Sequence, residues 1–211
     1  MDVSLPNTTS IDFPEIATLA DEGVLFVGCK LGTSSSRWDG WQELATSNKV
    51  QLLNWIKDGH GLATVAKRGH SFAIDIDDLA ACEAQGFKSE WLDGEYCVDT
   101  PSGGLHVHGL HDSITESLGN LINVYRTKGD KKSGKILELK LHNQSVAAPT
   151  AKRFADEKKC AGVYQPRQSG KKLKRGIHPE LLEWIKANGE APNIYDDSTE
   201  PDIDFHPDFV M

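Results

Sequence analysis

Two aspartates stand two residues apart inside an apolar run, FAIDIDD at residues 72–78. Side chains alternate between the faces of a β-strand, so Asp75 and Asp77 would share one face while the isoleucines between them enter a core. Two carboxylates in one small volume raise each other's pKa and are best tolerated with a cation between them. Hard cations such as Mg²⁺ and Mn²⁺ take oxygen ligands of this kind. The alternative is a cap for the following helix, a role that we expect of Asp78.

The segment ILELKLH, residues 136–142, repeats this arrangement. Its leucines alternate with Glu138, Lys140 and His142, so these polar side chains would lie opposite a leucine face. If this strand lies beside the first, Glu138 becomes a third acidic ligand and Lys140 can meet a phosphate oxygen. For one such strand taken alone, a solvated polar face is the commoner outcome.

The stretch TPSGGLHVHG, residues 100–109, predicts a glycine-containing turn that leads into a strand. Glycines let a ligand approach the backbone, and free N–H groups beside a serine hydroxyl would suit the oxygens of a triphosphate. The alternative is a plain hairpin turn followed by partly buried histidines. The candidate nucleotide contacts here are Ser102, Gly103, Gly104, His106 and His108.

Short apolar strands alternate with amphipathic helices, which predicts an α/β or α+β domain. We expect strands at residues 24–28, 62–66, 71–77, 95–100, 105–110, 135–142 and 144–149, and helices near 14–23, 49–59, 77–86 and 178–189. The lysine- and glycine-rich segments 126–135 and 164–176 predict mobile basic loops. The acidic segment 190–211 predicts a disordered tail or linker after a domain that spans residues 1–189.

The net charge of −8 is unevenly distributed along the 211 residues. Residues 190–211 hold seven acids and no Lys or Arg, so the remainder has 24 acids against 23 bases. Between Arg126 and Arg175 there are 15 Lys or Arg and four acids, a local excess of +11. This segment could follow a nucleic-acid backbone, or it could form an ordinary solvated surface.

The four cysteines have no short metal-binding spacing, so we expect reduced and mostly buried thiols. No apolar run approaches the roughly 18 residues that cross a bilayer, and the first residues lack the basic and apolar regions of a signal peptide. These features favour a cytoplasmic protein.

In combination and in order, the motifs resemble those of the archaeo-eukaryotic primase superfamily, in particular the primase-polymerase domains of phages, plasmids and integrated elements. The hydrophobic-Asp-hydrophobic-Asp motif is AIDID, the small-residue turn ending in His is SGGLH, and the third acidic motif with its downstream Ala-Pro is LELKLHNQSVAAPT. The preceding segment, from GVLFVGCK to NWIKDGHG, is similar to the family's lead-in. The resemblance spans roughly residues 17–150.

The resemblance implies an α+β fold, a primase catalytic core whose RRM-like antiparallel or mixed sheet is flanked by helices. It implies template-directed nucleotidyl transfer, by a DNA primase or DNA polymerase of phage or plasmid replication in a bacterial host cell. The implied partners are a single-stranded DNA template, a primer strand and nucleoside triphosphates. Family members often carry a helicase, so a replicative helicase domain or protein is a further expected partner.

The resemblance also assigns roles to single residues. Asp75, Asp77 and Glu138 look like the carboxylates that hold two Mg²⁺ or Mn²⁺ ions, although the family more often has Asp in the third position. His106 looks like the motif histidine that contacts the incoming nucleotide. The supporting nucleotide or phosphate contacts would be Ser102, Gly103, Gly104, Lys140, His108 and Arg37.

Two other functions fit parts of the sequence. His106 and His108 form a His-hydrophobic-His motif similar to the metal site of rolling-circle replication endonucleases, whose tyrosine attacks a DNA phosphate. Tyr125 or Tyr164 would then be the nucleophile, but this interpretation leaves the acidic residues unexplained. The remaining alternative is a nucleotide- or DNA-binding module without catalysis.

Overall fold

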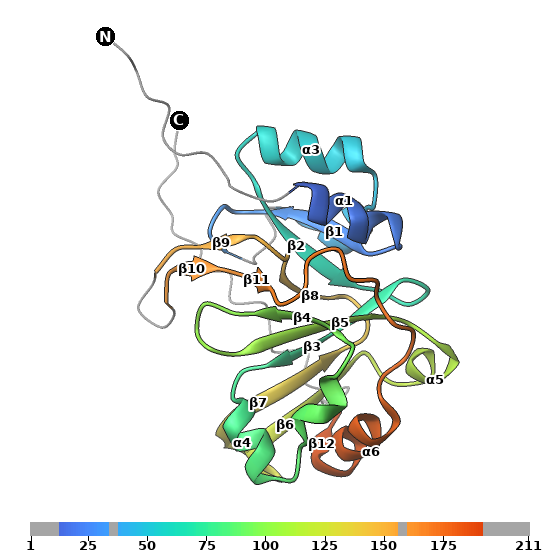
Figure 1. Ribbon diagram of the computed structural model, residues 1–211, viewed down its shortest axis with the longest axis vertical. Helices are drawn as coiled ribbons and strands as arrows, with labels where there is room; N and C mark the ends of the chain where they lie inside the picture. The colour runs from blue at the N-terminus through green and yellow to red at the C-terminus, as the bar shows by residue number, and fades with distance from the viewer. Residues whose placement is uncertain (1–12, 34–37, 156–159, 192–211) are drawn as a thin grey trace.

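Short leucine- and valine-rich runs form the strands, and the chain is α+β, with antiparallel sheets flanked by helices, as expected (Figure 1). The computed structural model describes residues 13–33, 38–155 and 160–191. In Figure 1, α1 and α3 lie against a small sheet at one end of the molecule, and α4 and α6 lie at the other end against a larger sheet.

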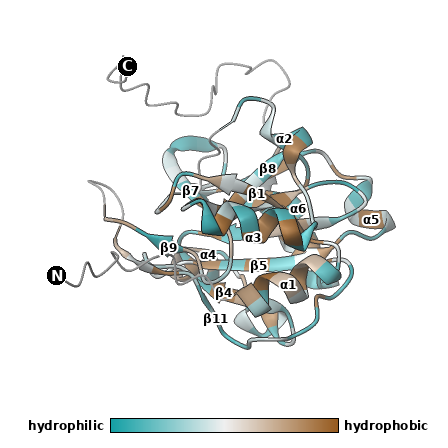
Figure 2. Ribbon diagram, turned by 90° about the horizontal axis from the view of Figure 1, so that it is seen from above, coloured by the Kyte–Doolittle hydropathy of each residue, from teal (hydrophilic) through white to brown (hydrophobic). Residues whose placement is uncertain are grey.

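The small sheet has the strand order β1-β2-β8. Its strands are β1 (Leu25–Cys29), β2 (Gly61–Ala66) and β8 (Gln144–Ala147), and the nearby helices are α1 (Phe13–Asp21), α2 (Trp41–Leu44) and α3 (Lys49–Lys57). Both α1 and α3 carry hydrophobic and hydrophilic residues (Figure 2), because one side of each helix packs on the sheet. Asn48 caps α3 by accepting hydrogen bonds from the N–H groups of Val50 and Gln51.

The large sheet has the order β11-β4-β5-β3-β7-β6-β12. Its strands are β3 (Ser71–Ile76), β4 (Tyr96–Asp99), β5 (Leu105–Leu110), β6 (Leu121–Thr127), β7 (Asp130–Lys140), β11 (Gln165–Pro166) and β12 (Gly189–Glu190). The remaining elements are α4 (Leu79–Ala84), the 3₁₀ helix η1 (Ser89–Leu92), α5 (Ser113–Glu116), α6 (Pro179–Asn188) and the paired strands β9 (Lys152–Arg153) and β10 (Gly162–Val163).

The two faces of the large sheet differ in chemistry. Leu137 and Leu139 of β7 are fully buried in a core that also contains Ile74 of β3 and Ile185 of α6. Each such side chain stabilises the fold by roughly 1.5–3 kcal/mol relative to an exposed position. The residues that alternate with these leucines point to the other face, which carries the charged side chains described below.

The chain crosses between the two sheets at β2–β3 and at β7–β8, which are neighbouring places, and it returns to the large sheet once more at β11. β2 leads into β3 and β7 leads into β8, while β2 pairs with β8 in the small sheet and β3 pairs with β7 in the large one. The two crossing segments therefore run side by side, and the strand pairs on both sides hold them together. This arrangement fixes the register of the two strands that carry the acidic motifs.

Segment 126–135, expected to be a mobile loop, is instead the turn and the two strand ends of the β6–β7 hairpin. Ser133 Oγ accepts a hydrogen bond from the Thr127 N–H and donates one to the Asp130 carbonyl. Its lysines are exposed, so the hairpin has no apolar pattern that would reveal it. Segment 164–176, also expected to be a mobile loop, begins with β11 and is then tied to α1, where the Gly170 N–H donates to Glu15.

The boundaries of the other predicted elements agree with the structure to within a few residues, and Asp78 is the N-cap of α4, as expected. Glu190 takes part in β12, so regular structure reaches one residue past the expected domain boundary. The rest of the predicted tail lies outside the described residues. No helix within the described ranges is long and apolar enough to cross a membrane. The cysteines are free thiols, and three of them are buried.

Candidate functional site

One row of side chains crosses the polar face of the large sheet. Asp75 on β3 pairs directly with His106 on β5 and with Glu138 on β7. Glu138 pairs in turn with Asn123 on β6. Directly opposed residues of antiparallel strands lie on the same face, with Cβ atoms about 4.5–5.5 Å apart. The structure thus brings together three predicted site residues from distant parts of the sequence.

Asp77 lies just past the end of β3 and extends the acidic cluster. The N–H groups of Asp77 and Asp78 both donate to the Ile136 carbonyl, at 3.0 and 3.3 Å, which holds this end of β3 against β7. The residue as a whole is exposed, yet partial desolvation of its carboxyl group, together with the charges of Asp75 and Glu138, raises the pKa of Asp77. Its carboxylate has no hydrogen bond or ion pair with another of the described residues. It is therefore available to a ligand.

A β-bulge brings one more residue to this face. Val124 pairs with Leu137 and Tyr125 with Lys135, so Ile136 has no opposite residue. In a regular strand Lys135 and Glu138 would point to opposite faces, but the bulge turns Lys135 toward the carboxylates. Its Nζ donates a 2.5 Å hydrogen bond to Glu138 Oε1. Lys135 is a site residue that the sequence pattern missed, because simple alternation assigns it to the leucine face.

Two lysines neutralise part of the negative charge. Lys140 Nζ is 2.8 Å from Glu138 Oε2 and 3.8 Å from Asp75 Oδ2, and only 8% of the residue is exposed. Burial alone would raise the pKa of Glu138, but Lys140 and Lys135 more than offset this effect and lower it. With three carboxylates and two ammonium groups, the cluster has a net charge of −1.

Within the described part of the chain, no three His, Cys, Asp or Glu side chains are already arranged as metal ligands. Each oxygen of Glu138 instead accepts a hydrogen bond from an ammonium group. The donor set itself, three carboxylates on one face, has the chemistry that Mg²⁺ or Mn²⁺ requires. To bind such a cation, one oxygen of Glu138 would have to give up its hydrogen bond with a lysine.

His106 is held between Asp75 and an aromatic ring. Its Nε2 lies 3.4 Å from Asp75 Oδ1, and its ring stacks on Tyr164 with centroids 5.2 Å apart. The residue is 5% exposed, and its Nδ1 has no hydrogen-bond partner among the described residues. The Tyr164 hydroxyl accepts a hydrogen bond from Arg153 at 3.1 Å. Tyr164 thus contacts the site through His106, although the sequence suggested only a loop in its segment.

His108 is deeper than expected. It is 2% exposed, lies edge-on to Tyr96 and is 6.2 Å from His106 between ring centroids. Burial lowers the pKa of His108 to about 3, so its ring is neutral at physiological pH. A direct contact between His108 and a nucleotide phosphate is therefore not supported. Its place is behind His106, where it supports that ring.

The turn before β5 lies against the end of β3. A Cβ atom at Gly104 would come within 2.4 Å of the Ile76 carbonyl oxygen and 3.4 Å of the Asp77 Cα, so only glycine permits this approach. The turn was expected to carry free backbone N–H groups, but those of its two glycines are both used. The Gly103 N–H donates to the Thr100 carbonyl and the Gly104 N–H to the Thr100 hydroxyl. The hydroxyl of the exposed Ser102 remains at the tip of the turn.

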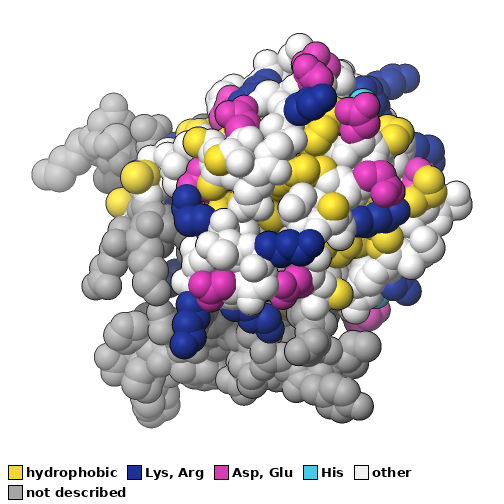
Figure 3. All heavy atoms as spheres, turned by 90° about the horizontal axis from the view of Figure 1, so that it is seen from below, with side chains coloured by type: hydrophobic (Ala, Val, Ile, Leu, Met, Phe, Trp, Pro, Cys, Tyr) yellow, Lys and Arg dark blue, Asp and Glu magenta, His cyan; other side chains and the backbone are white. Residues whose placement is uncertain are grey.

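Within the described part of the basic segment, acidic side chains offset some of the positive charge. Several of its side chains are paired with acids, as Arg126 is with Asp78, Arg167 with Asp99 and Lys174 with Glu95. Figure 3 shows Lys and Arg side chains interspersed with Asp and Glu on the face seen from below. Arg37, the remaining predicted phosphate contact, lies outside the described residues.

No model of a known protein family matches the chain, and no curated protein matches it. The chemistry that can indicate a function therefore lies in the carboxylates of Asp75, Asp77 and Glu138, which we call the acidic row, and in the two lysines beside them.

Proposed function

We propose that this protein is a template-directed nucleotidyltransferase, a DNA primase or DNA polymerase with a catalytic core of the archaeo-eukaryotic primase type. The observation that carries the proposal is the direct pairing of Asp75 with both Glu138 and His106, with Asp77 at the end of the same strand. This pairing brings the two acidic motifs and the histidine motif together on neighbouring strands.

The proposed cofactors are two Mg²⁺ or Mn²⁺ ions, held by Asp75, Asp77 and Glu138. Partial burial, together with the charges of Asp75 and Glu138, raises the pKa of Asp77 even though Lys135 and Lys140 oppose the shift, and a divalent cation would offset this cost. When bound, such ions lower the pKa of an attacking hydroxyl and neutralise charge on a leaving pyrophosphate.

The two lysines are proposed to have different roles when a triphosphate is bound. Ammonium groups form strong hydrogen bonds with phosphate oxygens. The side chain of Lys135 is 44% exposed and that of Lys140 only 10%, so Lys135 is the one that can leave Glu138 for a phosphate oxygen with little rearrangement. Lys140 would stay between Asp75 and Glu138 and hold the two carboxylates in position.

His106 and the glycine turn complete the proposed nucleotide site. His106 orients Asp75 through its Nε2 and is itself kept in place by Tyr164. The close approach of Gly104 to Asp77 supports a role for the Ser102 hydroxyl as a donor to the nucleotide. These are orientation and charge-stabilising roles rather than covalent catalysis.

The rolling-circle endonuclease is less well supported. A metal held by both histidines would need His108 to reach the surface, and its Nε2 is buried. Tyr164 is 6% exposed and its hydroxyl is bonded to Arg153, so it is poorly placed to attack DNA. A module without catalysis, in which the lysines and carboxylates form only a structural ion-pair network, is the more serious competitor.

Nucleotide incorporation on a single-stranded template separates these functions. The assay would be run with and without primer, with ribo- or deoxynucleotides, in Mg²⁺ or Mn²⁺. We expect synthesis by the wild type and a loss of at least about 100-fold in the Asp75→Asn plus Asp77→Asn double variant. Asp93→Asn, an exposed site on another loop, is the matched control. Equal incorporation by all three would refute the proposal, and covalent capture of cleaved DNA on a tyrosine would indicate the endonuclease.

A further inference from the structure

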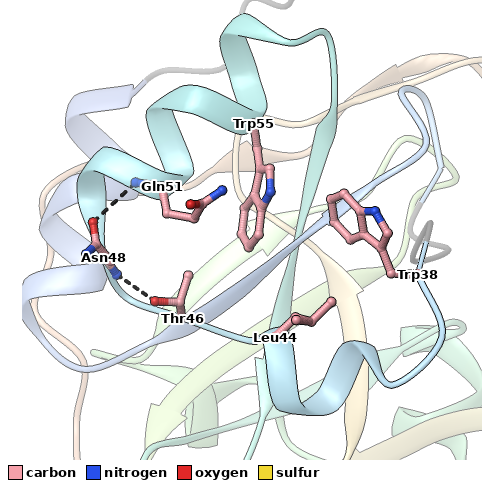
Figure 4. Close-up of a pocket in the computed structure, with 6 residues that line it drawn as sticks. All are labelled: Trp38, Leu44, Thr46, Asn48, Gln51 and Trp55. Carbon is pink, nitrogen blue, oxygen red and sulfur yellow. Dashed lines mark hydrogen bonds between the residues drawn. The ribbon is translucent and has the colours of Figure 1, made fainter.

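A pocket of about 410 Å³ lies in the small-sheet half of the molecule, on elements that carry none of the acidic motifs. Its volume is within the range of pockets that hold small organic ligands. The lining residues are Trp38, Leu44, Thr46, Asn48, Gln51 and Trp55. Figure 4 shows the two indoles on one side of this space and the three polar side chains on the other, with Leu44 below.

The aromatic wall is held firmly. The rings of Trp38 and Trp55 are 5.6 Å apart with an interplanar angle of 32°, and Trp38 also meets His60 edge-on at 5.4 Å. Both indoles rest on Gly28 of β1, where a Cβ atom would lie 2.7 Å from Trp38 and 3.3 Å from Trp55. The missing side chain at Gly28 is thus what lets the rings sit there. Trp55 is only 8% exposed, so the half-buried Trp38 presents more of its ring to a flat ligand.

The polar wall offers hydrogen bonds without charge. Asn48 Oδ1 is already used to cap α3, and the Thr46 hydroxyl oxygen accepts the Asn48 N–H. Gln51 is exposed, its carboxamide has no hydrogen bond with any other described residue, and Figure 4 shows it directed toward Trp55. A carboxamide presents one donor and one acceptor side by side, which matches the edge of a nucleobase, adenine above all.

We infer that this pocket binds a nucleobase, stacked on the indoles and read at its edge by Gln51. None of the six lining side chains is ionisable, so the pocket suits the uncharged base rather than its phosphate. A sugar also stacks on tryptophan, but its many hydroxyl groups would need more donors and acceptors than this wall supplies. The base can come from a free nucleoside or from an unstacked position of a single strand, which aromatic side chains bind readily.

The inference does not depend on the proposed nucleotidyl transfer. The pocket belongs to α2, α3 and their connections, whereas the carboxylates belong to the large sheet. Variants of the pocket leave the acidic row intact, and loss of metal-dependent synthesis would leave base binding unchanged. Failure of one proposal can therefore be distinguished from failure of the other.

The test measures binding of the full chain to adenosine and to a labelled oligodeoxyadenylate of about eight nucleotides, a length within the site size of single-strand binding folds. Salt of about 0.2 M weakens contacts that depend only on phosphates. Trp38→Leu and Gln51→Leu remove the stacking surface and the edge contact. Val50→Ala is the matched control, since Val50 is 70% exposed on the same turn of α3 and does not line the pocket.

We expect Trp38→Leu to weaken binding by about tenfold or more and Gln51→Leu to weaken it by about fivefold, with Val50→Ala equal to the wild type. Binding of adenosine alone would identify a free nucleoside as the source, and binding of the oligonucleotide alone would identify a strand. The inference is overturned if the wild type binds neither, if the two pocket variants bind as the control does, or if glucose competes as well as adenosine.

Discussion

Asp75 and Glu138 lie directly opposite each other on neighbouring strands, with the Lys140 ammonium group 3.8 Å from one carboxylate and 2.8 Å from the other. The carboxylates of directly opposed residues would repel each other strongly if no cation lay near them. The protein therefore carries its own cation at this point. We propose that divalent ions share this role when nucleotide is bound.

Removing the charge of Asp77 is expected to stabilise the metal-free protein. Because the pKa of Asp77 is raised, the folded state binds a proton more tightly than the unfolded chain, whose value is 3.8. Ionised Asp77 thus lowers the free energy of unfolding near neutral pH, and this penalty disappears as the pH falls through the folded pKa. Urea unfolding in a chelator should find Asp77→Asn more stable than the wild type near neutral pH and equal to it in acid. A less stable variant near neutral pH would contradict the crowding of the carboxylates.

Lys135 is expected to matter for nucleotide binding although the sequence pattern does not select it. Lys135→Met removes a donor to phosphate and should raise the KM for nucleoside triphosphate about tenfold, with a smaller effect on kcat. Lys132→Met, on the exposed part of the same strand, is the control and should behave as the wild type. If both variants have the wild-type KM, Lys135 only neutralises Glu138.

Gly104 is expected to be needed for its missing side chain. The Cβ atom of Gly104→Ala would collide with the Ile76 carbonyl, so we expect a loss of roughly 1–3 kcal/mol in the free energy of unfolding and displacement of the turn from Asp77. Gly103→Asn tests the same turn without a clash, because no atom lies near its Cβ position and asparagine tolerates its positive φ of 86°. Equal stability of the two variants would mean that the turn adapts.

The buried His108 makes stability depend on pH. Burial lowers the folded pKa of His108 to about 3, below its ordinary value of 6.5. The stabilising contribution of the neutral ring is therefore complete above the unfolded pKa and is lost as the pH falls toward the folded one. Between about pH 7 and pH 4.5 this loss amounts to roughly 2–3 kcal/mol. His108→Gln should therefore lose less stability than the wild type over this range, measured by urea unfolding. An identical loss in both proteins would place the histidine in a more polar environment than the structure indicates.

Strand alternation alone placed the acidic residues on one face and the leucines of β7 on the other, and the strand-to-helix junction correctly identified Asp78 as a cap. These features are local, so a single segment contains the whole signal. The pairing of Asp75 with Glu138 is not local. It depends on the crossings between the sheets. From the sequence alone, Glu138 could be called a third acidic ligand only if its strand lay beside that of Asp75.

Other features of the site arise from contacts between distant segments. The position of Lys135 depends on a bulge opposite β6, a strand that was not predicted. The depth of His108 depends on Tyr96 from the preceding strand, which covers its ring. Neither of these contacts is encoded by the spacing of residues in one motif.

Binding of Mn²⁺, measured by the loss of its free electron-spin signal in the presence of a non-hydrolysable nucleoside triphosphate, tests the acidic site most directly. We expect the wild type and Asp93→Asn to bind Mn²⁺ equally, and Asp75→Asn plus Asp77→Asn to bind it at least about tenfold more weakly. Equal binding by all three proteins would contradict a metal site at these carboxylates, and with it the proposed nucleotidyl transfer.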